Sequence, residues 1–529
     1  AGSASEGIII PPPAGSTDAA HMSGVKSLGQ VFFPPSAYGG TQTWVRQMLT
    51  VENGEYIYAK RLYEIAKYMG FDGWFINEET GGGSNSEWVA FIKEFNKIAD
   101  ANGDTQMEIQ WYNASRSPNT EILSTHKNTS QFLEYGAGGD YRSYADEIGC
   151  SKDDIFSKIY AGVQVVNSGH TGFTSYLNKS MPTTGHVGSL DLFCPEERIW
   201  KDNVKNYLGK NDTGDEAFAA MKKTFDNESQ MWVNYNADPS TTVTSGWPGL
   251  SGRVLERSVI SSMPFVSSFC VGVGKSRFVE GAKVVTKPWY HSGVQSIMPT
   301  WRWWIENKGD LTVAMDWDDA YNMGSSVKVS GKLSAGDHLM RLYKTMIPVT
   351  AGGTLRLVYK TSTAGSVEAK LSTESSTTPD VTLTAATTSE KNGWTVADYD
   401  LSSLNGKTIY MIGLNLKAAA EVADYSLSLG ELAVLPAAYA PAAVEVKNLA
   451  TTSVLGAEKG DIRVTWDYDY SADFDHFDIY TETASGARTL VGQTRDEAFY
   501  IPTFTREGTD AFVNVAVVPV MKDMKQQEA

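Results

Sequence analysis

The sequence feature that most constrains the fold is Gly70–Thr80, an apolar and aromatic run between two stretches of helical periodicity. Gly70 is typical of the end of the helix that precedes the run. The stretch Trp88–Ile98 repeats the helical spacing behind a candidate cap at Asn85 or Ser86. A buried run between two helices is typical of a parallel strand in a β-α-β unit. We therefore expect an α/β sheet built around this strand.

Similar apolar segments recur along the first half of the chain and alternate with amphipathic stretches. They predict six further strands, at Val25–Phe33, Gln106–Tyr112, Gln131–Tyr135, Tyr160–Val166, Val187–Phe193 and Pro264–Val271. Seven such strands indicate a (β/α)8 TIM-like barrel over residues 1–306 that lacks its first strand. Ile8–Ile10 is a poor candidate for that strand, because the prolines that follow it cannot donate ladder hydrogen bonds. We expect that the first strand is missing from this chain.

The sequence pattern changes near Asn307, where short alternating segments with Gly, Ser and Thr turns replace the helices. Residues 307–436 predict a jelly-roll-like antiparallel β-sandwich, which either binds carbohydrate or only supports the barrel. A Pro- and Ala-rich linker follows. Residues 437–529 predict a second sandwich of the fibronectin-III or immunoglobulin type. The expected fold class is therefore α/β plus all-β.

Composition excludes several kinds of partner. The formal net charge of −17 argues against nucleic acid and anionic membranes, because the chain has no basic stripe to neutralise phosphates. No apolar run reaches membrane-spanning length, so membrane insertion is not expected. The three cysteines and seven histidines show no ligand spacing, and we expect neither a metal nor another cofactor.

Two polar side chains at the end of the central strand are the strongest candidates for chemistry. Side chains alternate along a strand, so Asn77 and Glu79 project from one face and Glu78 from the other. The carboxyl ends of the strands are where α/β barrels place their active sites. The same pattern is equally compatible with a strand-end pair that makes ordinary hydrogen bonds, and Glu78 is expected to be structural.

An amide beside a carboxyl group suggests a particular reaction. Most glycoside hydrolysis uses two carboxylates, but here the second group is Asn77. An amide can orient the acetamido group of a sugar, whose own oxygen then attacks the anomeric carbon while Glu79 protonates the leaving oxygen. Aromatic neighbours should raise the pKa of Glu79.

Aromatic residues supply candidate sugar contacts. Tyr112 ends the next strand and could donate a hydrogen bond to the acetamide oxygen or tune it, and Trp111 offers a ring face, although a Tyr and a Trp of the core would show the same pattern. Trp232 lies in a loop-like stretch, where an exposed Trp more often binds than packs. The remaining candidates for substrate binding are Tyr135, Phe193 and Tyr235.

Several motifs in order along the chain then give a family resemblance. They are GQVFFPPSAYGG, YMGFDGWFINEET, WYNAS, YAGVQVV, ESQMWVNYNADPS, PFVSSF, MPTWRWW and WDDAYNMGSS. With these motifs the chain resembles the glycoside hydrolase family 85 endo-β-N-acetylglucosaminidases. The family's Asn-x-Glu motif falls on Asn77-Glu78-Glu79, and its assisting tyrosine falls on Tyr112. The resemblance implies substrate-assisted, retaining cleavage between the two GlcNAc residues of the N-glycan core, often with transglycosylation.

Departures from the family pattern leave the glycan preference open. Glycines follow Tyr135 where a stacking Trp is expected, and Gln164 stands where the family has an aspartate. Two alternatives remain: a chitinase-like or hexosaminidase-like hydrolase, and a non-catalytic glycan-binding protein. We expect the partners to be N-linked glycans of glycoproteins, the chain to be a monomer, and its location to be secreted or on a bacterial cell surface.

Overall fold

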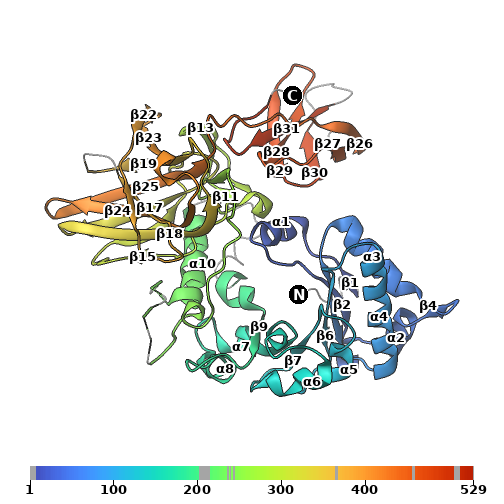
Figure 1. Cartoon of the computed structure of the whole chain (residues 1–529). Helices are drawn as coiled ribbons and strands as arrows, with labels where there is room; N and C mark the ends of the chain where they lie inside the picture. The colour runs from blue at the N-terminus through green and yellow to red at the C-terminus, as the bar shows by residue number, and fades with distance from the viewer. Residues whose placement is uncertain are drawn as a thin grey trace. The chain divides into compact units, whose positions relative to one another are not determined.

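A computed structural model describes residues 8–201, 215–234, 237–238, 240–241, 243, 245–363, 367–455, 459–505 and 513–527 (Figure 1). The chain divides into two compact units, which are described separately below. The first comprises residues 1–21, 25–212 and 219–255, and the second comprises residues 22–24, 213–218 and 256–529. None of the described helices combines the length and the apolarity that crossing a lipid bilayer requires.

A seven-stranded sheet in the order β1-β2-β5-β6-β7-β8-β9 forms the centre of the first unit. Its strands are β1 (Ile9–Ile10), β2 (Gly29–Phe33), β5 (Gly73–Glu78), β6 (Glu108–Tyr112), β7 (Thr129–Leu133), β8 (Ile159–Gln164) and β9 (Ser189–Phe193). Strands β2 to β9 pair in parallel, as the β-α-β pattern predicts. Within the described residues the sheet is an open path from β1 to β9, so a parallel α/β sheet is confirmed but closure into a barrel is not.

Helices connect the strands and cover one face of the sheet, as α3 and α4 show beside β2 and β6 in Figure 1. The α-helices among the described residues are α1 (Ala14–Met22), α2 (Gln42–Met48), α3 (Ile57–Met69), α4 (Asn85–Ala101), α5 (Thr120–Leu123), α6 (Ala145–Ile148), α7 (Val165–Ser168), α8 (Thr174–Ser180) and α10 (Asp215–Val233). Gly70 ends α3 in the left-handed conformation with φ of 75°, as predicted. The cap of α4 differs from the prediction, because Ser84 and Glu87 form a capping box one residue earlier.

The core between sheet and helices consists of alternate strand residues that meet the apolar faces of α3 and α4. Trp74 and Ile76 of β5 are fully buried there with Phe91 and Phe95 of α4. Burying each such side chain contributes about 1.5–3 kcal/mol. Gly73 permits the close approach of β5 to β6, because a Cβ at this position would lie 1.9 Å from the carbonyl oxygen of Glu108.

Two sequence-based strand assignments need correction. Ile9–Ile10 does form a strand, but it pairs antiparallel to β2 rather than parallel. The predicted seventh barrel strand, Pro264–Val271, is reduced to β10 (Phe265–Ser267), which pairs antiparallel with β25 (Val422–Leu435) in the second unit. A short apolar run has the same pattern in either kind of sheet, so periodicity does not reveal its partner.

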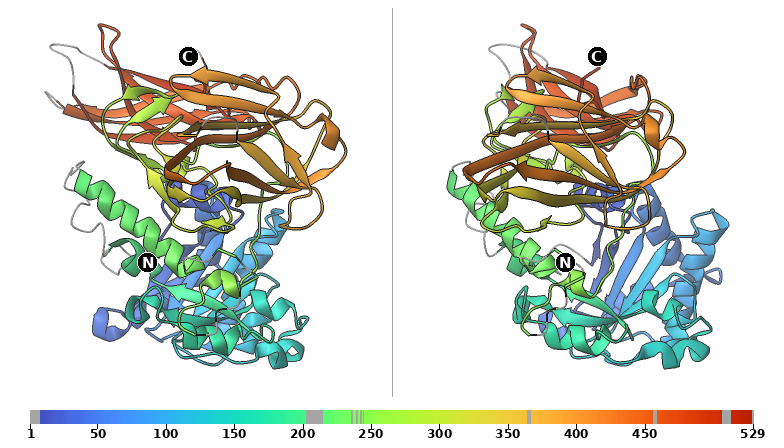
Figure 2. Two further views of the ribbon diagram at one scale, coloured as in Figure 1. Left: turned by 90° about the vertical axis from the view of Figure 1, so that its left-hand side faces the viewer. Right: turned by 60° about the vertical axis from the view of Figure 1, so that its left-hand side comes forward.

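The second unit consists largely of antiparallel sheets, which are drawn in yellow to red in Figure 2. One sheet has the order β16-β17-β25-β19-β23-β22, with β10 beside β25, and another has the order β15-β18-β24-β20-β21. Their strands are β15 (Trp304–Ile305), β16 (Thr312–Asp316), β17 (Ser326–Leu333), β18 (Gly336–Pro348), β19 (Thr354–Thr361), β20 (Glu368–Ser372), β21 (Val381–Leu383), β22 (Thr387–Lys391), β23 (Trp394–Asp400) and β24 (Thr408–Ala418). The all-β character predicted beyond Asn307 is confirmed.

Two three-stranded sheets, β26-β27-β30 and β29-β28-β31, follow at the end of the chain. Their strands are β26 (Lys447–Leu455), β27 (Lys459–Asp467), β28 (Phe474–Glu482), β29 (Arg488–Thr494), β30 (Ala498–Thr505) and β31 (Asn514–Met521). Trp466 and Phe477 pack edge to face in their core, with ring centroids 5.2 Å apart. Three short pairs complete the described strands: β3 (Val51–Glu52) with β4 (Glu55–Tyr56), β11 (Val273–Gly274) with β14 (Trp289–Tyr290), and β12 (Arg277–Val279) with β13 (Ala282–Val285).

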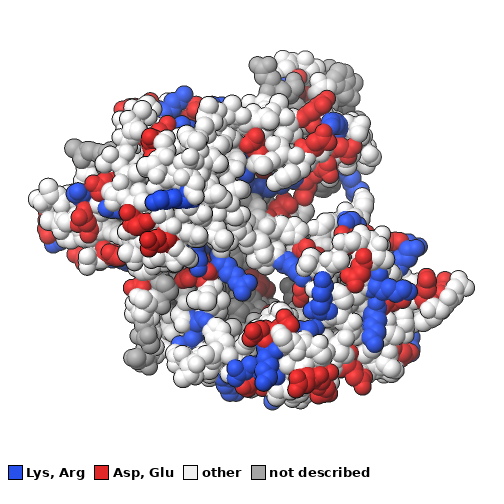
Figure 3. All heavy atoms as spheres, in the orientation of Figure 1, with Lys and Arg blue, Asp and Glu red and all other residues white. Residues whose placement is uncertain are grey.

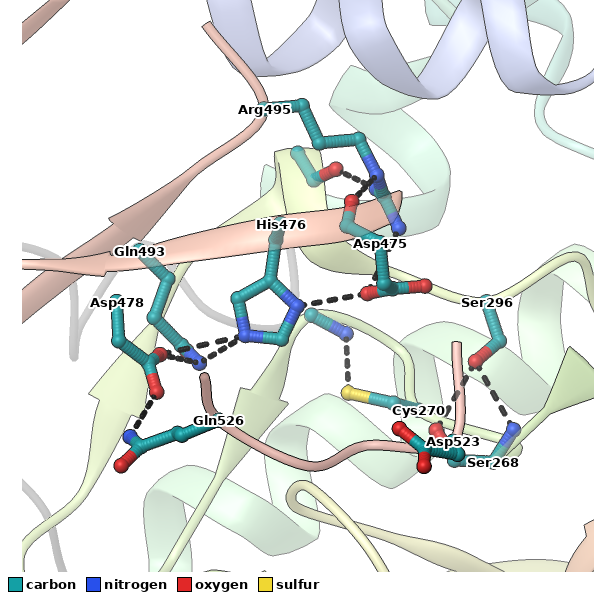
Figure 4. A network of polar contacts seen from close by, with 12 residues as sticks. Ser268, Cys270, Ser296, Asp475, His476, Asp478, Gln493, Arg495, Asp523 and Gln526 are labelled. Atoms are coloured by element: carbon teal, nitrogen blue, oxygen red, sulfur yellow. Dashed lines mark hydrogen bonds and ion pairs between the residues drawn. The ribbon is translucent and has the colours of Figure 1, made fainter. Parts of the chain in front are cut away.

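Surface charge shows no single dominant patch on the face in Figure 3, where Lys and Arg side chains are interspersed with Asp and Glu. A network of buried charged side chains lies inside the second unit. His476 of β28 is fully buried and contacts Asp475 at 2.7 Å and Asp478 at 3.2 Å (Figure 4). Asp478 also pairs with Arg277 of β12 at 2.8 Å, and both side chains are almost inaccessible.

These contacts determine the charge states of the buried network. Burial alone would raise the pKa of Asp478, but hydrogen bonding to His476 and the charge of Arg277 hold it well below its usual range. Burial alone would lower the pKa of His476, but hydrogen bonds to Asp475 and Asp478 raise it overall. The network is thus a set of paired buried charges that joins β28 to β12.

We predict that Asp478→Asn destabilises the second unit by about 3–5 kcal/mol, because Arg277 and His476 lose their buried partner. The pair contributes when Asp478 is ionised and His476 is protonated. The loss should therefore be largest between about pH 4 and pH 6.5, and should shrink as pH falls through the lowered Asp478 pKa or rises through the raised His476 pKa. Denaturant unfolding followed by hydrogen exchange of β28 measures it. Asp469→Asn, at an exposed ion pair, is the control and should have no effect.

Candidate active site

The pairing register of β2, β5 and β6 sets the geometry of the candidate site. Phe32, Asn77 and Tyr112 stand side by side in one row across the three strands. Because side chains alternate along a strand, Phe75, two residues before Asn77 on β5, faces the same way as Asn77. This face is opposite to the one that packs on the helices. The strand ends therefore present a continuous set of side chains away from the core.

A pocket of about 440 Å³ lies on this face. Its volume is within the usual range for small-molecule sites. The residues that line it come from β2, β5, β6, β7 and β9 and from the segments next to these strands: Leu28, Gly29, Gln30, Phe32, Phe75, Asn77, Glu79, Gln110, Tyr112, Phe132, Tyr135, Asp191, Leu192, Phe193, Cys194, Pro195 and Glu196. Asn77, Glu79 and Tyr112, the three predicted catalytic residues, are thus brought together in one pocket.

The amide of Asn77 has an unpaired oxygen, as do those of Asn96, Asn113 and Asn415, but of these four described residues only Asn77 lines the pocket. Its side-chain oxygen, Oδ1, is buried and has no hydrogen-bond partner among the described residues. Leaving such an acceptor unpaired costs about 1–3 kcal/mol, so buried amides are nearly always satisfied. Because the atom belongs to a pocket-lining side chain, an N–H or O–H group of a ligand can supply the missing donor.

Glu79 lies two residues further along the same face and is half-buried. Burial raises its pKa, and the negative charge of Glu134 raises it further, while a hydrogen bond from Tyr112 acts in the opposite direction. The net upward shift keeps part of the population protonated at higher pH than an exposed glutamate would be. A carboxyl group in this state can donate a proton and later accept one.

Tyr112 is held by a residue that the sequence analysis did not single out. Its hydroxyl group donates a hydrogen bond to Oε2 of Glu134, which follows β7 directly. Burial raises the pKa of Tyr112, and the bond to Glu134 raises it further, so the phenol remains protonated. Glu134 thus fixes the orientation of Tyr112 and also adds negative charge near Glu79. Its position two residues after Phe132 is the sequence signal that could have identified it.

Asp191 of β9 is a second carboxylate that the sequence analysis missed. Burial raises its pKa to about 6, although a hydrogen bond from Gln110 at 3.1 Å lowers it in part. Both residues line the pocket. They add polar groups to the side of the pocket that β6 and β9 form, and either can bond to the hydroxyl groups of a ligand.

Glu78 faces the other way, as alternation predicts. Its Oε1 atom accepts a hydrogen bond from the backbone N–H of Gly81 at 2.5 Å, and burial raises its pKa. It does not line the pocket formed by the alternate residues. This carboxylate ties down the loop that follows β5.

The predicted sugar contacts have mixed outcomes. Tyr135 and Phe193 line the pocket, with ring centroids 5.5 Å apart. Trp111 does not: it is 3% exposed and packs against Trp88 in the helix-covered core, because it lies on the opposite face of β6 from Tyr112. Trp232 lies within helix α10 instead of a loop and packs against a hydrophobic cluster. Tyr235 lies outside the described residues.

Comparison with models of known protein families shows which family the chain belongs to. The model of glycosyl hydrolase family 85 matches residues 4–277, which is more than half of the chain. The chain belongs to glycosyl hydrolase family 85. A second model, for the C-terminal domain of family 85 endohexosaminidases, matches residues 441–529. The resemblance inferred from the sequence motifs is confirmed.

Endo-β-N-acetylglucosaminidases of several organisms are similar to this chain. The human cytosolic endo-β-N-acetylglucosaminidase is 26% identical over 367 residues, which cover 66% of this chain and 44% of the human protein. Cytosolic endo-β-N-acetylglucosaminidase 1 of Arabidopsis thaliana is 23% identical over 367 residues, with 65% and 47% covered. The chain thus spans about half the length of the curated relatives it matches.

A solved structure resembles the chain along nearly all of its length. The glycoside hydrolase domain of Endo-D from Streptococcus pneumoniae aligns with a TM-score of 0.79 and 25% identity, covering 98% of this chain and 83% of that one. The comparisons also correct one expectation. The curated family 85 relatives are named as cytosolic enzymes, which contradicts the predicted secreted or cell-surface location.

We predict that Glu134→Gln lowers the pKa of Glu79, because it removes the neighbouring negative charge that helps to raise it. Carbon-13 NMR titration of labelled glutamate carboxyl groups measures the shift, and Glu79→Gln identifies the signal. Glu196→Gln neutralises a glutamate that lines the pocket and is the matched control. An unchanged or higher Glu79 pKa in Glu134→Gln would contradict the electrostatic description of the site.

Proposed function

We propose that this chain is an endo-β-N-acetylglucosaminidase that cleaves the GlcNAc-β1,4-GlcNAc bond in the core of N-linked glycans. The observation that supports this most directly is the unpartnered buried oxygen of Asn77, two residues before a half-buried glutamate in one pocket. The names of the family 85 relatives point to the same activity. The proposed substrates are therefore N-linked glycans of glycoproteins.

In the proposed first step, the acetamide of the sugar supplies the nucleophile. Asn77 Oδ1 accepts a hydrogen bond from the acetamide N–H, which satisfies the oxygen that is unpaired without ligand. The acetamide oxygen then attacks the anomeric carbon. The bond from the anomeric carbon to the leaving sugar breaks as Glu79 transfers its proton to the oxygen of that sugar, and an oxazolinium-type intermediate forms that keeps its N–H proton.

In the second step, Glu79 acts as a base. Its carboxylate takes a proton from water, whose oxygen attacks the anomeric carbon from the side that the leaving group vacated. The bond between that carbon and the acetamide oxygen breaks, so the product keeps the original configuration and Glu79 is protonated again. An acceptor sugar in place of water gives transglycosylation. The raised pKa of Glu79 suits both roles.

Tyr112 and Glu134 position the reacting groups in this scheme. Tyr112 is hydrogen-bonded to Glu134 and close enough to Glu79 to influence its pKa. We propose that Tyr112 turns its hydroxyl group toward the acetamide oxygen when substrate binds, and that Glu134 is a positioning residue. The rings of Tyr135 and Phe193 would contact the sugar faces.

We also propose the larger architecture in which this site works. Residues 1–306 would form a TIM-like barrel and be followed by two β-sandwich domains, 307–436 and 437–529. The parallel order from β2 to β9 and the match to the Endo-D domain support this division. Strand β10 would then cross from the first domain into the sheet of the second. A monomer remains our expectation.

We predict that the wild-type chain leaves one GlcNAc on a high-mannose or core-type glycopeptide, as mass spectrometry can show. Glu79→Gln should lose activity about 10²–10⁴-fold because it removes the acid and base. Asn77→Ala should lose about 10²–10³-fold because the developing charge loses its hydrogen bond. Glu78→Gln, which alters the carboxylate next to Glu79 in the sequence, is the matched control and should keep most of the activity.

An oxazoline donor separates the two roles. If Asn77 acts in forming the intermediate, a preformed GlcNAc-oxazoline donor should restore transfer by Asn77→Ala but not by Glu79→Gln. Unchanged glycopeptides after incubation with the wild-type chain would contradict the proposed function and favour a glycan-binding protein.

We predict that Tyr112→Phe lowers kcat about 10–100-fold with a smaller effect on KM, since a hydrogen bond involving a charged group contributes about 1.5–3 kcal/mol. Glu134→Gln should also lower kcat and should shift the basic limb of the pH–rate profile to lower pH, following the Glu79 pKa. A fall in kcat for Glu134→Gln without any change in the pH profile would contradict its role as a positioning residue.

A further inference from the structure

A second pocket, of about 320 Å³, lies in the second unit. Its floor is a row of side chains in register across four neighbouring strands: Val266 of β10, Ala433 of β25, Arg356 of β19 and Asp398 of β23. Figure 1 shows β25, β19 and β23 next to one another. This face is opposite to the one that carries the buried Leu432, because side chains alternate along β25.

Glu431 of β25 is the most informative residue of this pocket. The side chain is 7% exposed, and its Oε2 atom accepts a hydrogen bond from the amide of Asn322 at 2.9 Å. Its other oxygen, Oε1, makes no hydrogen bond to any described residue. Burial raises the pKa of Glu431 to about 7, in spite of the nearby Arg356 charge. The unused oxygen of a carboxyl group on a pocket can accept a hydrogen bond from a ligand, or donate one when the group is protonated.

Arg356 supplies the complementary donor. Its Nε and Nη2 atoms bond to the two oxygens of Asp398 at 2.7 and 3.1 Å, and its Nη1 atom makes no hydrogen bond within the described residues. Glu431 and Arg356 are diagonal neighbours on adjacent strands, since Ala433 is the residue opposite Arg356. Diagonal neighbours are about 7–8 Å apart, a separation that one sugar ring with its hydroxyl groups can bridge.

The charge balance indicates what kind of molecule fits. Acidic and basic side chains around the pocket nearly cancel: Glu280, Asp398, Glu431 and Asp523 against Arg356, Lys522 and Lys525. A site for phosphate or another strong anion would carry an excess of donors and positive charge. A neutral polyol instead needs donors and acceptors together, because each hydroxyl group does both. Ala433 and Val266 offer an apolar surface for C–H groups, and Tyr321 and Tyr439 also line the pocket.

We propose that this pocket binds one neutral pyranose residue of a glycan, with Glu431 and Arg356 as its main hydrogen-bonding groups. The site lies wholly within the second unit and does not depend on the proposed catalytic function. It would hold the substrate glycan, or a neighbouring one, by a sugar that is not cleaved. Such a second contact increases the local concentration of glycan by linkage.

Saturation-transfer NMR tests the proposal with three probes: methyl α-mannoside, methyl β-galactoside and the methyl glycoside of N-acetyl-β-glucosamine. The full chain carrying Asn77→Ala and Glu79→Gln prevents turnover. We expect at least one probe to bind at concentrations of up to about 10 mM. Ala433→Leu, which fills the floor, and Glu431→Gln should each weaken binding at least about fivefold, equivalent to roughly 1 kcal/mol. Glu390→Gln on the exposed strand β22 is the matched control.

Hydrogen exchange of the protein without pocket substitutions provides an independent readout. The bound probe should slow exchange in β25 and β19. The proposal is overturned if none of the three probes binds, which would mean that water alone satisfies Glu431. It is also overturned if a probe binds but protects neither strand, since the sugar then occupies another site. Because the catalytic residues are already replaced, either failure leaves the proposed hydrolysis untested and intact.

Discussion

The in-register parallel pairing of β2, β5 and β6 is the constraint on which the rest of the site depends. It places Asn77 beside Tyr112, and the alternation of side chains then places Glu79 on the same face. Trp74, Ile76 and Trp111 project from the opposite face into the hydrophobic core. Packing on that face thus holds the polar face in position, and a slip of one residue would send Asn77 and Glu79 into the core.

The polar face has groups that lack favourable partners when no ligand is bound. Asn77 lacks a partner for its buried oxygen, while Glu79 and Asp191 have raised pKa values because burial disfavours their charge. Each of these features is unfavourable in the free protein and is relieved by a ligand that carries N–H and O–H groups. An acetamido sugar carries both. The polar groups therefore make the site selective for ligands with N–H and O–H groups, which a purely apolar pocket of the same size would not be.

Much of this arrangement follows from the sequence, and the failures have physical reasons. The alternation of side chains along a strand places Asn77 and Glu79 on one face. The end of α3 at Gly70 is also predictable, because it depends only on the local sequence. The same alternation shows that Trp111 faces away from Tyr112, although an aromatic residue at a strand end looks like a sugar contact. Alternation places Glu134 on the same side as Phe132, but its bond to Tyr112 depends on β7 lying beside β6, which the sequence pattern does not reveal. The partner of β10 is likewise invisible to periodicity, since antiparallel and parallel buried strands share one pattern.

The central claim is that the substrate's own acetamide attacks while Asn77 holds it. The most direct test is the hydrolysis rate of a substrate series whose acetamide carries zero, one, two or three fluorine atoms on its methyl group. Fluorine withdraws electrons from the amide oxygen without altering Glu79, so we predict a steep, progressive fall in kcat/KM along the series. Rates that are independent of fluorine number would show that the acetamide is not the nucleophile, and would contradict the role assigned to the unpaired oxygen of Asn77.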